Sequence, residues 1–218
     1  MIKVAIVDTV LSTSQAACLN LQQVENHHPH LPGLAQSNHG ALVVSLFNRQ
    51  VKVAHALSYY GLLCSQGTTN GKDFYYLLCR LARQRFDVIN LSFSMAHTSA
   101  CDVIAELIKD MQEAGTVVVT SAYNERHLGI GFPASCAHTI GVTEQEGGDG
   151  RALKVVDEEM KLIALKPQAH RIELEGIPVH VCGNSYSAPL ISALIANHLG
   201  DTQGAGTTRA VWDFLTRK

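Results

Sequence analysis

Three polar side chains lie where apolar segments of this 218-residue chain begin or end. Asp8 closes the run VAIVD, His39 opens HGALVVS, and Ser185 lies where the turn GNS enters an apolar segment. A carboxylate at the end of a buried strand is costly without a partner. A helix start near Ser185 would offer free backbone N–H groups and a field that favours negative charge. Taken singly, each residue also fits a structural interpretation, as a turn residue, a solvated histidine or a helix cap.

Six segments taken together resemble the subtilisin-like serine peptidases, or subtilases. VAIVDT looks like the family's aspartate motif, NHGALVVS like its histidine motif H-G-T-H-V-A-G, and GNSYSAP like its serine motif G-T-S-M-A-A-P. DVINLSFS resembles the substrate-binding strand, AGTVVVTSAYNE the oxyanion segment, and FPASCAHTIGV the Y-P-A-S segment. The order Asp–His–Ser is that of subtilisins among triad enzymes. The matches cover nearly the whole chain, and Asn184 in place of the motif's threonine is a mild change.

The resemblance implies acyl transfer through a covalent intermediate. Ser185 would attack the scissile carbonyl, His39 would take its proton, and Asp8 would orient the imidazole. The Asn124 side chain and the Ser185 N–H would hold the oxyanion. We therefore expect a serine endopeptidase acting on a specific peptide or protein, for which processing of a precursor peptide would fit. A transpeptidase or macrocyclase shares the same triad, so that alternative stays open. The third hypothesis is a non-catalytic binding module, against which the four intact residues argue.

The resemblance also implies which residues bind substrate, namely Ser92, Phe93, Ser94, Ala122 and Tyr123. In the family, glycines stand near the position of Ser94 and at that of Tyr123, and both line the pocket for the residue before the cleaved bond. Side chains at these positions should narrow the pocket. We expect a preference for glycine or alanine there, unless Tyr123 points away from the pocket, and both interpretations stay open.

Other site classes lack their motifs. An α/β-hydrolase needs G-x-S-x-G and the order Ser–Asp–His, but here the serine comes last and Ser187 replaces the second glycine. The sequence contains no G-x-G-x-x-G, no P-loop and no H-E-x-x-H motif. The cluster of His27, His28 and His30 is interpreted as a solvated loop rather than a metal site. The sequence therefore predicts no cofactor and no metal.

Strand and helix patterns alternate along most of the chain. Strands are predicted at 3–8, 51–57, 86–94, 116–122 and 138–144. Helices are predicted at 38–50, 73–85, 99–115, 187–200 and 207–218, with Asn38 as a cap and Pro189 in a first turn. This order predicts an α/β fold, a doubly wound and mostly parallel sheet flanked by helices. Short strands around 150–182 predict a small antiparallel section, and we expect one domain over 1–218.

Ligands of such sheets bind beyond the carboxyl ends of the strands. Asp8, Asn90 and Asn124 fall at or near such ends, so the pattern predicts a site there.

Composition restricts the partners. Seventeen Lys and Arg against 19 Asp and Glu give a net charge of −2, so neither nucleic acid nor a membrane is an expected partner. The six cysteines form no C-x-x-C pair and predict buried, reduced thiols. The first apolar run is too short for a secretory signal, so we expect a cytoplasmic chain. No inhibitory prodomain or calcium loop is evident, and folding is then either unaided or helped by a partner protein.

Overall fold

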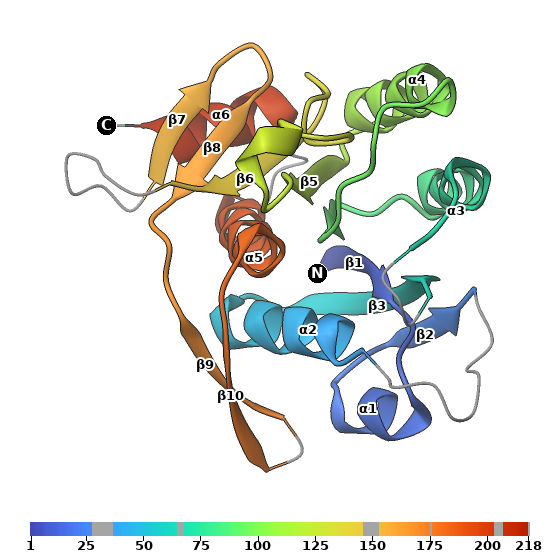
Figure 1. Ribbon diagram of the computed structural model, residues 1–218, viewed down its shortest axis with the longest axis vertical. Coiled ribbons are helices and arrows are strands. Elements are labelled where there is room, and N and C mark those ends of the chain that lie inside the picture. Colours follow the sequence, from blue (N-terminus) through green and yellow to red (C-terminus); the bar gives the residue numbers. More distant parts are fainter. Residues whose placement is uncertain (28–36, 65–67, 146–152, 175, 203–206, 218) are drawn as a thin grey trace.

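The computed structural model describes residues 1–27, 37–64, 68–145, 153–174, 176–202 and 207–217. The described residues form an eight-stranded sheet with helices on both faces (Figure 1). Its strands are β1 (Ile2–Thr9), β2 (Gln23–Asn26), β3 (His55–Leu63), β4 (Val88–Leu91), β5 (Val117–Ser121), β6 (Ile140–Glu144), β7 (Leu153–Asp157) and β8 (Leu162–Leu165). Their order is β2-β3-β1-β4-β5-β6-β8-β7, and only the β7–β8 pair is antiparallel. The predicted doubly wound, mostly parallel α/β fold is confirmed.

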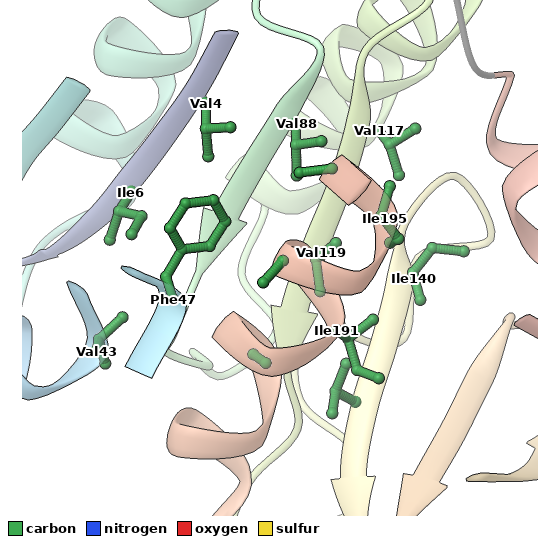
Figure 2. Close-up of a cluster of buried hydrophobic side chains, with 14 of the residues drawn as sticks. Val4, Ile6, Val43, Phe47, Val88, Val117, Val119, Ile140, Ile191 and Ile195 are labelled. Carbon is green, nitrogen blue, oxygen red and sulfur yellow. The ribbon is translucent and has the colours of Figure 1, made fainter. Parts of the chain in front are cut away.

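Helices bury both faces of this sheet. They are α1 (Thr13–Cys18), α2 (His39–Gln50), α3 (Gly71–Gln84), α4 (Ala100–Glu113), α5 (Asn184–Thr202) and α6 (Thr208–Thr216), with a 3₁₀ turn at Arg126–Leu128. Side chains of β1 alternate between the faces: Val4 and Ile6 pack with α2, α5 and α6, while Ala5 and Val7 pack with α3 and α4. Figure 2 shows Phe47 of α2 in the first of these clusters, facing the sheet. This two-sided burial explains why the strands read as continuous apolar runs.

The strand order gathers the polar residues at one edge. The chain builds β2 and β3 on one side of β1, then crosses through α3 to β4 on the other side. The carboxyl ends of β1, β4 and β5 therefore lie side by side where the winding changes direction, which is where open α/β sheets bind ligands.

One strand was misplaced by the sequence pattern. The segment 51–57 was predicted as a strand, but β3 runs from His55 to Leu63. Its second half contains Gly61, at which a Cβ atom would lie 2.2 Å from Asn26 Oδ1 and 2.8 Å from Val10 Cα. The glycine therefore serves a close approach of the neighbouring chain and does not end the strand.

The predicted antiparallel section divides into two parts. β7 pairs antiparallel with β8, but β8 continues the main sheet in parallel with β6. The other part is a separate hairpin of β9 (His170–Leu174) and β10 (Ile177–Val181). The hairpin lies beside α2, where Ile172 and Val181 pack on Leu42 and Leu46 (Figure 1).

Two smaller expectations need correction. Helix α5 begins at Asn184, so Pro189 is its sixth residue and not part of the first turn; its ring nitrogen cannot bond the Ser185 carbonyl. All six cysteines are free, but Cys18 and Cys182 are exposed and only Cys101 and Cys136 are buried. Within the described part of the chain, no helix combines the length and apolarity needed to cross a bilayer.

Candidate active site

Asp8 lies near the carboxyl end of β1, and its side chain is fully buried. Its Oδ1 atom accepts a hydrogen bond of 2.6 Å from the Thr9 N–H and lies 2.7 Å from His39 Nδ1. A carboxylate only accepts hydrogen bonds, so Nδ1 of the imidazole carries the proton and donates it to Asp8. Nε2 of a neutral His39 is then the acceptor.

His39 is the first residue of α2, and backbone contacts fix its approach to β1. The Gly40 N–H donates to Thr9 Oγ1 at 3.1 Å, and the Tyr59 hydroxyl donates to the Thr9 carbonyl. A Cβ atom at Gly40 would lie 1.8 Å from the Tyr59 oxygen, so only glycine permits this packing. The glycine after His39 therefore lets the start of α2 come close to Asp8.

The environment of His39 favours its charged form. Burial lowers the pKa of His39, but the charge of Asp8 and the hydrogen bond to Asp8 together raise it by more. The pKa of His39 therefore lies above its ordinary value of 6.5. The ring of Tyr186 lies 4.9 Å from the His39 ring, centroid to centroid. Burial, followed by the charges of Asp8 and Cys182, raises the pKa of Tyr186 to about 12.

Ser185 lies in the first turn of α5, and its Oγ atom is 2.8 Å from His39 Nε2. The turn before it requires Gly183, which has a φ of +124° and at which a Cβ atom would lie 3.1 Å from Asn124 Oδ1. The structure thus joins Asp8, His39 and Ser185 in one hydrogen-bonded chain. Such a chain can transfer the hydroxyl proton to the imidazole as the oxygen attacks an electrophile.

Asn124 follows β5 and faces the same corner. Its Oδ1 atom accepts a 2.9 Å hydrogen bond from the Asn184 N–H, which leaves the NH₂ group as the donor on the other side of the amide. Among the described residues, the N–H of Ser185 has no acceptor, whereas those of Tyr186 and Ser187 bond the Gly183 carbonyl. The Asn124 NH₂ group and the Ser185 N–H are therefore two donors on residues that line one cavity.

A cavity of about 360 Å³ opens at this corner. His39, Asn124 and Ser185 line it, together with all five residues predicted to bind substrate: Ser92, Phe93, Ser94, Ala122 and Tyr123. Sequence reasoning missed five further lining residues, Thr9, Ser37, Leu63, Ser121 and Glu125. Glu125 is the last residue of the segment AGTVVVTSAYNE and directly follows Asn124, so that segment was the available signal.

Tyr123 lines the cavity, and its ring lies close to Gly131. A Cβ atom at Gly131, whose φ is +74°, would lie 2.7 Å from Cε2 of Tyr123 and 3.1 Å from Cβ of Ser94. The Ser94 hydroxyl donates to the Ser121 carbonyl, which ties together the ends of β4 and β5. Burial and the neighbouring Cys101 thiol raise the pKa of Tyr123. Both side chains line the same cavity as Ser185 and occupy space that glycines would leave open.

Among the described residues, no three His, Cys, Asp or Glu side chains are grouped to hold a metal ion. His28 and His30 of the histidine cluster lie outside the described residues.

The fold is that of the subtilisin-like serine proteinases. One solved structure that shares it is Sphericase, with a TM-score of 0.74 and 16% identity, covering 99% of this chain and 82% of that one. A cold adapted subtilisin-like serine proteinase gives a TM-score of 0.71 at 14% identity, with 97% and 79% covered. No protein-family model matches the sequence, and no curated protein matches it either. At these identities the similarity shows the fold.

Proposed function

We propose that this chain is a serine endopeptidase that cleaves its substrate through an acyl-enzyme. The observation that carries the proposal is the hydrogen-bonded chain Asp8–His39–Ser185 beside a cavity with two N–H donors. A buried carboxylate, an imidazole with Nε2 free to accept, and a serine hydroxyl at 2.8 Å are the parts that activate a serine oxygen. The presence of all these groups in one chain also argues against a pure binding module.

In the proposed mechanism, Ser185 Oγ attacks the scissile carbonyl carbon while its proton moves to His39 Nε2. The carbonyl oxygen becomes an oxyanion, which the Asn124 NH₂ group and the Ser185 N–H stabilise. The imidazolium, paired with Asp8, then protonates the leaving amine, and the carbon–nitrogen bond breaks to leave the acyl-enzyme. Water, deprotonated by His39, releases the acid and restores the serine hydroxyl.

A fluorophosphonate probe tests this proposal without a known substrate. The probe should bond covalently to the folded protein, and Ser185→Ala should abolish the labelling. Ser45→Ala, which removes a serine hydroxyl from α2 away from the cavity, is the matched control and should label as the parent does. A folded parent protein that takes up no label would overturn the proposal and favour a binding module. In a cleaved peptide, a free carboxylate in the product indicates hydrolysis, whereas a new amide indicates transpeptidation.

We further propose that the residue before the cleaved bond is small. Tyr123 and Ser94 line the same cavity as Ser185, and both side chains lie close to Gly131. Glycines at these two positions would leave a deeper pocket. A glycine or alanine of a specific peptide, such as a precursor, fits the remaining space.

A further inference from the structure

Asn184, directly before the proposed nucleophile, is buried and fully bonded. Asn184 is only 4% exposed, and its Nδ2 atom donates to the carbonyls of Ala122 at 3.2 Å and Tyr123 at 2.6 Å. Its Oδ1 accepts from the Glu144 N–H at 2.6 Å. Its own N–H donates to Asn124 Oδ1 at 2.9 Å. One residue thus connects the start of α5 with the ends of β5 and β6.

These bonds fix the segment that carries the oxyanion donor. Asn184 bonds the two carbonyls that precede Asn124 and also the side-chain oxygen of Asn124 itself. From the other side, the Ala122 N–H donates to the Val142 carbonyl at 2.8 Å. The amide of Asn124 therefore has one orientation, with its NH₂ group directed away from Asn184.

The carboxylate of Glu144 supports the same corner. Its Oε1 atom accepts from the Ser187 hydroxyl at 2.7 Å and from the Gly183 N–H at 3.3 Å. The turn that presents Ser185 is thus bonded on both sides, by Glu144 and by Asn124. The amide at position 184 donates two hydrogen bonds and accepts one, whereas a threonine hydroxyl would have one proton to donate.

We propose that Asn184 is a positioning residue that holds the Asn124 NH₂ group and the Ser185 N–H at a fixed separation, as the two donors of the oxyanion site. The inference rests on the proposed peptidase function. Asn184 touches no reacting atom; it acts through Asn124.

The test uses Asn184→Asp, which keeps the size of the side chain but removes both donors, and Asn184→Ala. Asn197 on the same helix supplies the matched control, since it accepts from the Lys52 N–H at 2.7 Å and donates to the Gln50 carbonyl at 3.1 Å, far from the cavity. Each folded variant is reacted with a fluorophosphonate over a range of concentrations. This separates the maximal labelling rate from the concentration for half-saturation.

We expect the maximal rate to fall about 100-fold in both Asn184 variants, with half-saturation unchanged, because misplacing a reacting group by about 1 Å has such an effect. Asn197→Ala should lose stability but keep the parent rate. In an Asn124→Ala background, Asn184→Asp should have little further effect, because the residue through which it acts is gone. Asn184→Thr, whose hydroxyl can donate one hydrogen bond, should label faster than Asn184→Asp but slower than the parent. It is used in place of Asn184→Ala if the alanine variant does not fold.

Parent-like labelling by folded Asn184→Asp would overturn the inference, and so would an undiminished effect in the Asn124→Ala background. Both outcomes leave the peptidase proposal intact. Absence of labelling in the parent protein overturns the peptidase proposal and this inference together, so the two failures are distinguishable.

Discussion

Removal of the Tyr123 ring should widen the range of substrates. In Tyr123→Ala, the space next to Gly131 that the ring occupies should become available to the residue before the cleaved bond. Filling it with a phenylalanine side chain of the substrate would remove an apolar ring from water. That burial is worth about 1.5–3 kcal/mol.

This free energy converts into a rate ratio. At about 1.4 kcal/mol for each tenfold change, the variant should gain about 10- to 150-fold for a phenylalanine-type substrate relative to an alanine-type one. The assay uses two peptidyl diphenyl phosphonates that differ only in this side chain, so no natural substrate is needed. Their second-order rates of labelling Ser185 are compared in parent and variant.

The matched control is Tyr76→Ala, which removes a tyrosine that is 56% exposed on α3 and does not line the cavity. It should leave the ratio of the two rates unchanged. The reasoning is refuted if the parent protein already labels equally fast with both probes. An unchanged ratio in Tyr123→Ala would refute it as well, since the ring would then not limit the pocket.

Three further substitutions test how the fold holds the proposed base. The labelling rate of the parent should rise with pH through a midpoint above about 6.5, because the pKa of His39 is raised. Asp8→Asn should slow labelling about 10⁴-fold and move this midpoint below about 6.5, because only burial would then act on the pKa of His39. An unmoved midpoint would contradict this reasoning. Gly40→Ala should lower the free energy of unfolding in urea by about 1–3 kcal/mol and slow labelling, because its Cβ atom would clash with the Tyr59 hydroxyl. Adding Tyr59→Phe to this variant should restore part of the stability and part of the labelling rate. If it restores neither, the clash with Tyr59 is not the cause. Phe47→Ala, a fully buried ring, should cost about 3–5 kcal/mol in the same unfolding assay, and a loss below 1 kcal/mol would contradict its place in the core.

Much of the fold could be predicted because strands that are buried on both faces consist of continuous apolar residues. The runs around Val4–Val7 and Val117–Val119 have no polar interruption, and their ends mark the edge where ligands bind. The mostly parallel sheet follows from their alternation with helices. Asp8, His39, Asn124 and Ser185 could be selected because six segments resemble the subtilase motifs in the right order, whereas each residue taken singly also fits a structural role. The structure brings them together, while their catalytic roles stay predictions.

Other elements leave no such pattern. Strand β2 has the sequence QVEN, and none of its residues is fully buried, so no alternation distinguishes it from a loop. Helix α1 has six residues and is specified by a capping box at Ser12 rather than by an apolar face. Its signal is a local exchange of hydrogen bonds with Gln15, which periodicity does not detect.

The contacts of Asn184 were beyond sequence reasoning for a different reason. Its partners Glu144, Asn124 and Tyr123 lie 40, 60 and 61 residues earlier in the chain. Only the strand order brings these segments together, so a change from threonine to asparagine appeared mild when judged by side-chain chemistry alone. Substitutions before a nucleophile should therefore be judged by the backbone groups that meet there.

The proposed catalytic chain is held by contacts that are distinct from those of the core. Gly40 and Asn184 act through hydrogen bonds of backbone groups at the strand ends, whereas Phe47 acts through apolar packing about two turns from His39 on the same helix. Phe47→Ala should therefore lower the free energy of unfolding while folded molecules label at the parent rate. Gly40→Ala should lower both, because its Cβ atom displaces the start of α2 directly. Equal losses of labelling rate in the two variants would mean that core packing, and not the strand-end hydrogen bonds, positions His39.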